Sequence, residues 1–260
     1  MLTIRDHLLV DCPYVPAADH GGTFDAGEPQ FIILHYTAGT SFDSDLTQLT
    51  ADDSTEVSSH LLIDRDGYIA QLVPFNIVAW HAGVSSWEGY ESLNYHSIGI
   101  ELVNPGYARE GINFDGPTIH AAHKNGGEEL DWYLYTDEQV LAVVDCCKAL
   151  MRAYPTITEV IGHDDVAPDR KVDPGPAWDW EAFNALLYAT EPGIGDDKLE
   201  QWFTWKPPSS DLDPILEGLY GEAYTLARLI TDQTPYSSEQ ILALRRLREC
   251  LMYCTASLTR

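Results

Sequence analysis

A proline- and glycine-rich stretch, GHDDVAPDRKVDPGP (residues 162–176), restricts the fold more than any other feature of this sequence. Its three prolines and two glycines exclude a continuous helix, because proline lacks a backbone N–H and its ring clashes with the preceding turn. The stretch nevertheless carries His163, Lys171 and Asp173. Two interpretations stay open at this point: a solvated surface loop, or a site whose side chains are aimed by a stiff, irregular backbone.

Short apolar runs before this stretch predict buried strands. FIILHYTAG (31–39) ends in a turn, and SIGIELV (97–103) contains one charged residue, Glu101, in an otherwise apolar run. HLLIDRDGYIAQLV (60–73) has two β-rich runs around Asp66-Gly67, which is a strong hairpin signal. A carboxylate inside a buried strand is costly unless it is paired or used, so Glu101 is a candidate functional residue.

Helical patterns alternate with these strands. YTDEQVLAVVDCCKALMRAYP (135–155) has a capping box at Thr136 and Gln139 followed by an apolar stripe. ITEVIGH (157–163) then reads as a strand, and WDWEAFNALLYAT (178–190) as a second helix. Strands interleaved with helices predict an α/β fold, in which a central mixed β-sheet is flanked by helices.

The composition changes near residue 191, which predicts a boundary between a catalytic domain, 1–190, and an extension, 191–260. The extension contains two amphipathic patterns, 213–231 and 237–254, that suit a helical hairpin. Large aromatic side chains in a linker are stabilised when they are buried against other apolar surface, so we expect the hairpin to pack on the core. The linker has three such rings, namely Trp202, Phe203 and Trp205.

The charge balance excludes several partners. Forty-one acidic residues against fifteen basic ones give a formal charge of −26, so nucleic acid and anionic membranes are poor partners. The apolar runs are shorter than the roughly 20 residues of a membrane helix, so no membrane insertion is expected. The start, MLTIRDHLLVDCP, has no apolar signal-peptide region, so we expect a cytoplasmic protein. Release by lysis or a dedicated secretion route is the alternative.

Polar residues at strand ends can be pooled into one constellation: His35, Glu101, His163, Lys171 and Asp173. Two imidazoles and a carboxylate, with a fourth position left for water, are typical of a catalytic zinc site. Each residue has a simpler interpretation on its own, because a lone histidine is more often structural and a lysine–aspartate pair in a solvated loop contributes little. The chain has no HExxH motif, which excludes the common zinc-protease helix.

Four blocks in order carry a family resemblance: ILHYTAG, SSHLLIDRDGYIAQLVP, AWHAGVSSWEGYESLNYHSIGIELVN and GHDDVAPDRKVDPGPAWDW. From about residue 31 to 187 the chain resembles the zinc-dependent N-acetylmuramoyl-L-alanine amidases of the amidase-2 family, which share the fold of peptidoglycan-recognition proteins. The AmpD/AmiD branch is the most similar. The resemblance implies hydrolysis of the amide between N-acetylmuramic acid, or its 1,6-anhydro form, and L-alanine of peptidoglycan or muropeptides.

The resemblance also implies roles for individual residues. One Zn²⁺ per chain would be held by His35, His163 and Asp173, where some relatives use a cysteine as the third ligand. Glu101 would be the general acid/base and Lys171 the cationic stabiliser. Residues in blocks that line or support the cleft in relatives are tentative substrate contacts: His81, Trp80, Trp87 and Asn94.

Other residues of these blocks are given supporting roles. For His81, support and substrate contact are equally favoured, whereas His60 is expected to be structural. Many phage-type and animal relatives have a tyrosine at the position of Ser59, whose role Glu101 takes in this branch. His120 and His123 are expected in a solvated loop. Two other functions remain: the same chemistry in an endolysin or secreted effector acting on intact wall, and a non-catalytic peptidoglycan receptor.

Overall fold

The computed structural model describes residues 2–52, 57–188, 196–203 and 214–233, together with a few positions beyond them: 240, 243, 244, 246–248, 250, 251 and 254. The chain divides into two compact units, Met1–Leu187 and Tyr188–Arg260. Each unit is described separately below.

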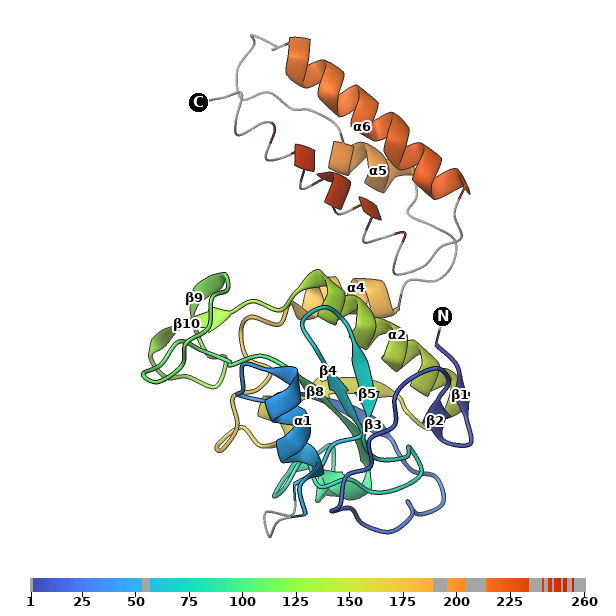
Figure 1. The fold of residues 1–260 in the computed structure, drawn as a ribbon, viewed down its shortest axis with the longest axis vertical. Coiled ribbons are helices and arrows are strands. Elements are labelled where there is room, and N and C mark those ends of the chain that lie inside the picture. The colour runs from blue at the N-terminus through green and yellow to red at the C-terminus, as the bar shows by residue number, and fades with distance from the viewer. Residues whose placement is uncertain are drawn as a thin grey trace. The chain divides into compact units, whose positions relative to one another are not determined.

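The first unit is built on a mixed sheet, which has five strands within the described residues, in the order β11–β3–β8–β4–β5 (Figure 1). β11, β3, β8 and β4 are parallel to one another, and β5 runs antiparallel to β4. The bounds are β3 Phe31–Tyr36, β4 Leu61–Ile63, β5 Ile69–Gln71, β8 Ser97–Leu102 and β11 Glu159–Gly162. The predicted α/β fold, its strands and the hairpin at Asp66-Gly67 are confirmed.

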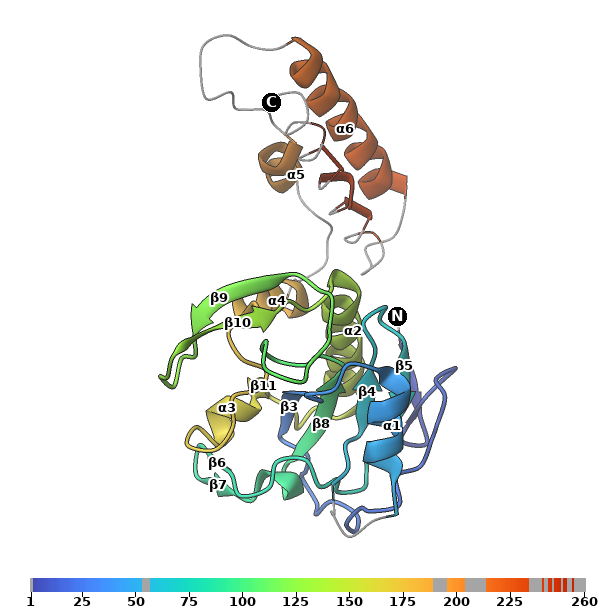
Figure 2. The same ribbon diagram turned by 60° about the vertical axis from the view of Figure 1, so that its left-hand side comes forward.

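Helices flank this sheet. α1 (Phe42–Thr50) packs on the face that carries Leu62, while the longer α2 (Asp137–Ala153) lies across the opposite face (Figures 1 and 2). The capping box at the start of α2 is confirmed: the backbone N–H of Gln139 donates to Thr136 Oγ1, and the Gln139 side chain accepts from the Thr136 N–H. The predicted second helix is α4 (Trp180–Leu187). α1 was not predicted, because its sequence FDSDLTQLT is mostly polar.

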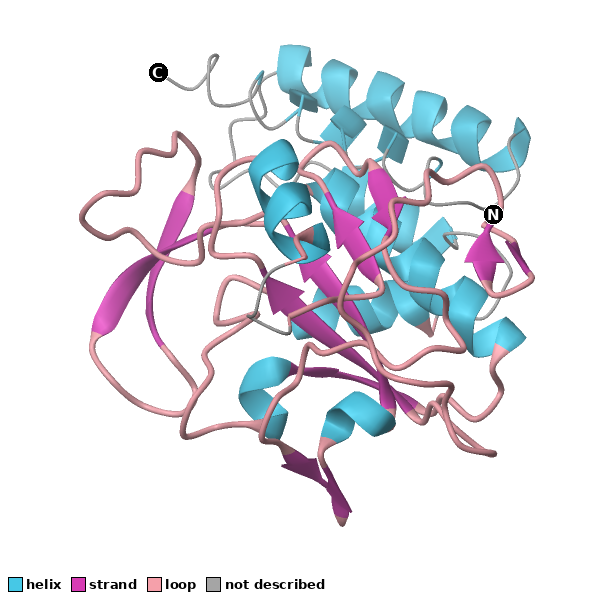
Figure 3. Ribbon diagram, turned by 60° about the horizontal axis from the view of Figure 1, so that its bottom comes forward, coloured by secondary structure: helices cyan, strands magenta, loops and turns pink. Residues whose placement is uncertain are grey.

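A β-hairpin projects from the side of the sheet (Figures 2 and 3). β9 (Thr118–Ala122) pairs antiparallel with β10 (Glu129–Tyr133), and we call this hairpin the arm. The expectation of a solvated loop at His120 and His123 is therefore only half right for each residue. His120 is exposed but lies on β9, where it is paired across the strands with Asp131, whereas His123 lies in the turn of the hairpin but is buried at 6% exposure. Trp132 of β10 stabilises the arm, because its side chain is only 1% exposed and its Nε1 donates a hydrogen bond to the carbonyl oxygen of Ala121 on β9.

The smaller elements of the first unit connect these parts. They are β1 Ile4–Arg5, β2 Leu8–Leu9, β6 Ser86–Trp87, β7 Tyr90–Glu91, a 3-10 turn at Leu93–Tyr95 and α3 His163–Val166. None of the helices in the described parts of the chain has both the length and the apolar composition that crossing a membrane requires.

The second unit has its own apolar cluster. α5 (Asp196–Phe203) and α6 (Pro214–Gln233) pack together, and α6 confirms the helix predicted at 213–231. The helix predicted at 237–254 lies largely outside the described residues, as does Trp205. The buried members of the cluster are Leu199, Phe203, Ala223, Ala227, Leu244 and Leu251, with Trp202 at its margin. Packing of this unit on the first one stays a prediction.

Candidate metal centre and active-site cleft

The parallel strands deliver polar side chains to one edge of the sheet. The carboxyl ends of parallel strands meet at the same edge, which is where open α/β sheets form their sites. His35 is next to last in β3 and is the register partner of Glu101 on β8. His163 directly follows β11, which pairs with β3 on its other side. Residues 35, 101 and 163, far apart in the sequence, therefore become neighbours.

The proline-rich stretch turns back on itself to bring Asp173 to the same edge. α3 extends the chain only as far as Val166, and the backbone N–H of Lys171 donates to Ala167 O at 2.9 Å. The N–H of Asp164 then donates to the carbonyl oxygen of Asp173 at 2.8 Å. This backbone bond places Asp173 beside His163. The second of the two interpretations of residues 162–176, a backbone-aimed site, is thus the one that the fold supports.

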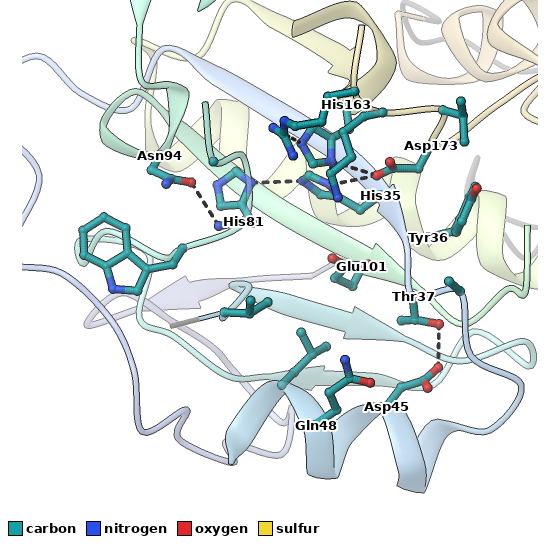
Figure 4. Close-up of a pocket in the computed structure, with 18 residues that line it drawn as sticks. His35, Tyr36, Thr37, Asp45, Gln48, His81, Asn94, Glu101, His163 and Asp173 are labelled. Carbon is teal, nitrogen blue, oxygen red and sulfur yellow. Dashed lines mark hydrogen bonds and ion pairs between the residues drawn. The ribbon is translucent and has the colours of Figure 1, made fainter. Parts of the chain in front are cut away.

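Three donor atoms converge at this point (Figure 4). His35 Nδ1 lies 2.8 Å from His163 Nδ1, and Asp173 Oδ2 lies 3.0 Å and 2.9 Å from these two nitrogens. His35 and His163 are 1% exposed and Asp173 is 6% exposed. A His–His–Asp set of this kind is suitable for a metal ion.

The other ring nitrogens face away from the centre. His163 Nε2 lies 3.1 Å from the carbonyl oxygen of Ala82, which can only accept a hydrogen bond. His163 must therefore carry its hydrogen on Nε2, and its Nδ1 presents a lone pair to the centre. His35 Nε2 lies 3.0 Å from His81 Nδ1. The three converging atoms are all buried acceptors. A cation bound between them would satisfy their lone pairs better than any placement of protons on them.

Electrostatics also favour a cation here. Burial, and then the neighbouring His163, lower the pKa of His35 to about 4, so this imidazole is neutral near pH 7. Burial alone would raise the pKa of Asp173, but hydrogen bonds with His163 and His35 outweigh it and hold that pKa well below its usual range. The centre therefore consists of a neutral imidazole and a carboxylate, which are forms that bind metal ions.

Glu101 faces the same cleft without a fixed partner. Burial, and then the charge of Asp173, raise its pKa to about 8, while Lys171 opposes the shift. Its Oε2 is buried and has no hydrogen-bond partner, although the side chain keeps some surface open to the cleft. A carboxyl group with a pKa near neutrality can both accept and donate a proton, as a general acid/base requires.

A cavity of about 620 Å³ contains these groups, and Figure 4 shows them around it. Of the tentative substrate contacts, Trp80, His81 and Asn94 line it. Trp87 lies elsewhere in this unit, where its Nε1 donates to Glu159 Oε2 at 3.0 Å, so a role in contacting substrate at the metal has no geometric support. The predicted cleft residues His35, Glu101, His163, Lys171 and Asp173 are all in its wall.

The supporting residues behave mostly as expected. His60 is buried, lies 2.9 Å from Ile77 O and accepts from the Gly99 N–H, which is a structural role. Ser59, also buried, donates to Gly99 O at 2.8 Å and does not face the centre in the manner of a catalytic tyrosine.

Some cleft residues were missed by the sequence analysis. Asp45, on α1, is 3% exposed and accepts a hydrogen bond from Thr37 Oγ1. Arg170 lines the cleft, and its guanidinium donates to the carbonyl oxygens of Ala82 and Val84. A signal for Arg170 was present, because it stands next to Lys171 in a chain with very few cations.

A mixed sheet that carries a His–His–Asp set suitable for a metal ion, beside a buried carboxyl group, is the type of site found in metal-assisted hydrolases. Comparison with known proteins makes this specific. The chain belongs to the N-acetylmuramoyl-L-alanine amidase family (Amidase_2), whose sequence model matches residues 25–176. It is thus an amidase that hydrolyses the bond between N-acetylmuramic acid and L-alanine.

Individual relatives support this assignment. The chain is 34% identical to the 1,6-anhydro-N-acetylmuramyl-L-alanine amidase AmpD of Salmonella typhimurium (strain SL1344), over 69% of this chain and 91% of the relative. It is 36% identical to the N-acetylmuramoyl-L-alanine amidase AmiD of Escherichia coli (strain K12), over 81% and 71% of the two chains. The fold alone is also matched by the solved structure of E. coli AmiD with an anhydro-muropeptide substrate, which covers 97% of each chain with 24% identity and a TM-score of 0.51.

Proposed function

We propose that this amidase uses one zinc ion, held by His35, His163 and Asp173, to cleave soluble 1,6-anhydro-muropeptides. The convergence of two imidazole nitrogens and one carboxylate oxygen within 3.0 Å of one another carries the proposal. Three nitrogen and oxygen ligands from the protein are typical of catalytic zinc sites. The chemistry that zinc supplies when bound is a polarised amide carbonyl and a water whose pKa is lowered to about 7.

Glu101 is proposed to move the proton. Its carboxylate accepts the proton of the attacking water, and the resulting carboxylic acid delivers it to the nitrogen of the departing L-alanine. The amide C–N bond then breaks, leaving a muramyl carboxylate and a free amine. The place of Glu101 in the wall of the cavity, together with a pKa raised to about 8, supports this role.

Lys171 is proposed to stabilise the negative charge that develops on the carbonyl oxygen during attack. It lines the cleft with Glu101, and its charge is near enough to lower the pKa of Glu101. Preorganised positive charge in a shielded cleft is often the largest electrostatic contribution to such a reaction. The complete set of these groups argues against a non-catalytic receptor.

The anhydro-muropeptide substrate is proposed from the relatives. The AmpD relative is named for the 1,6-anhydro form, and the AmiD structure contains anhydro-N-acetylmuramic acid linked to L-Ala-D-γ-Glu-L-Lys. We propose a cytoplasmic location, where soluble muropeptides would be the substrate. A wall-lytic enzyme with the same chemistry is the second candidate, and it is favoured only by the additional C-terminal unit.

The two candidates differ in substrate preference. At equal concentrations of stem peptide, we expect the protein to release peptide from soluble anhydro-muropeptide at least about tenfold faster than from intact sacculi. A soluble substrate can reach the orientation needed at the metal without deforming a polymer. Release of free stem peptide, followed by chromatography, measures both rates under one condition. Equal or faster hydrolysis of sacculi would show that the enzyme is wall-lytic.

The second unit is proposed to pack on the catalytic unit. Leu226 and Leu229 of α6 remain 47% and 48% exposed, so this unit retains apolar surface that such packing could cover. A chain truncated at Thr190 should then aggregate or lose activity on small muropeptides, because an apolar footprint becomes exposed. Size-exclusion chromatography and the anhydro-muropeptide assay measure both effects. A truncated chain that stays monomeric, binds zinc and is fully active would instead show that the extension is an independent lobe.

A further inference from the structure

His81 lies against the metal ligand His35 on the side opposite the metal donors. Its Nδ1 is 3.0 Å from His35 Nε2, and the two rings meet edge to face with centroids 5.1 Å apart. His81 is 8% exposed. Figure 4 shows it beside His35, on the side away from Asp173 and joined to His35 by a dashed line, so its ring is placed to act on His35.

The hydrogen-bond partners of His81 fix where its hydrogen lies. Its Nε2 is 3.4 Å from both the carbonyl oxygen and the Oγ of Ser97. The Ser97 hydroxyl donates to Leu93 O at 2.6 Å, so its Oγ can offer His81 only a lone pair. Both neighbours of Nε2 are therefore acceptors, and Nε2 must carry the hydrogen. Neutral His81 then has a bare Nδ1.

This assignment determines the tautomer of His35. A bare Nδ1 on His81 can only accept, so His35 must donate from Nε2. His35 consequently keeps the lone pair of Nδ1, which is the atom that faces His163 and Asp173. The opposite orientation would put two hydrogens between His35 and His81, or leave the metal side of His35 protonated.

The surrounding residues hold His81 in this position. A Cβ at Gly99 of β8 would lie 2.4 Å from Cγ of His81, so only glycine leaves room for the ring. Asn94 Oδ1 accepts from the backbone N–H groups of His81 at 3.0 Å and Ala82 at 2.6 Å. Both the backbone and the ring are thus fixed by groups that do not themselves face the metal donors.

We propose that His81 is a positioning residue, which locks His35 in the tautomer that presents Nδ1 to the metal, and that Asn94 and Gly99 hold His81 in place. The inference rests on the zinc centre proposed above. It distinguishes between support and substrate contact, the two roles that the sequence favoured equally for His81. Partners of this kind behind a histidine ligand typically contribute 10- to 100-fold to metal affinity.

Two substitutions at His81 test the acceptor role. His81→Leu removes the acceptor, whereas His81→Asn places an Oδ1 near the position of the lost Nδ1. We expect the zinc Kd, measured by competition with a chromophoric chelator, to rise about 10- to 100-fold in His81→Leu and to recover to within a few-fold of wild type in His81→Asn. His96→Leu is the control, because the Nδ1 of His96 lies 2.7 Å from Glu28 Oε1 and His96 is not one of the converging donors; it should keep its zinc Kd.

A measurement on the unmodified protein covers the case in which a variant does not fold. In the zinc-loaded full-length chain, ¹⁵N NMR of the histidine rings should show hydrogens on Nε2 of both His35 and His81. A hydrogen on His81 Nδ1, or an unchanged zinc Kd in His81→Leu, would overturn this proposal alone. A wild-type chain that binds no zinc would overturn the zinc centre as well.

Discussion

Replacing Glu101 with alanine should lower kcat by about 10²–10⁴, the usual contribution of general acid–base catalysis, while zinc content and fold are retained. Glu101 sits beside His35 on the neighbouring strand but is not one of the three converging donors. Its loss therefore removes the proton carrier and leaves the metal ligands in place. Steady-state hydrolysis of anhydro-muropeptide and metal analysis of the purified variant test the two halves of this expectation.

A second variant, Glu101→Gln, allows a measurement that does not depend on turnover. The pKa of Glu101 is raised to about 8 in the folded chain, so between its unfolded value near 4.5 and pH 8 the native state binds the extra proton. The stability of wild type therefore falls as the pH rises through this window. Glu101→Gln should remove this dependence, so metal-free Glu101→Gln should resist urea better than metal-free wild type at pH 8.

The results for Glu101 would contradict the proposal in two distinguishable ways. If Glu101→Ala lost its zinc, Glu101 would be a ligand and the acid/base role would be wrong. If it kept both zinc and activity, Glu101 would have no part in the reaction.

Removing the metal should abolish hydrolysis, and added zinc should restore it. Metal analysis should find one zinc per chain, and His163→Ala should lower the zinc content and activity together, since two donors remain where three converge. Because the ligand imidazoles must be neutral to bind, zinc affinity should also fall on acidification, and at His35 the proton competes effectively only as the pH approaches the lowered pKa of about 4. Zinc-binding measurements from neutral pH down to about pH 4 follow this loss.

A matched control for the metal experiment is His96→Ala. His96 is partly buried and its Nδ1 lies 2.7 Å from Glu28 Oε1, so it resembles His163 in having a carboxylate partner but is not one of the converging donors. It should keep its zinc and its activity. Full hydrolysis by a chain shown to be free of metal would make the zinc assignment untenable.

The sequence predicted the parts of the fold that local patterns specify. The strand carrying His35, the hairpin at Asp66-Gly67 and the capped helix at 137–153 follow from apolar period, turn chemistry and a capping box. The convergence of His35, His163 and Asp173 was implied by family resemblance, and spacing alone did not establish it. What joins them is parallel pairing between β3 and β11 and one backbone bond from Asp164 to Asp173, which no local pattern reveals.

The features that were missed depend on tertiary contacts. The turn of the arm contains His123, which is buried against Asp164 of α3, its Nε2 lying 2.9 Å from Asp164 Oδ2. Helix α1 is too polar to be recognised by its apolar face, and its buried Asp45 is accommodated only because Gly39 lacks a Cβ, which would lie 1.8 Å from the Asp45 carboxylate. In each case the partner lies elsewhere in the chain.

The position of β11 at the edge of the sheet should affect how fast the protein is degraded in a cell. Among the described residues β11 pairs only with β3, and an ion held by His35, His163 and Asp173 would join this edge strand and the loop after it to the centre of the sheet. A ligand that binds only the native state adds to its stability by mass action. Zinc starvation should thus shorten the half-life of the protein, since without the ion the edge strand β11 would unfold locally more often and become accessible to proteases.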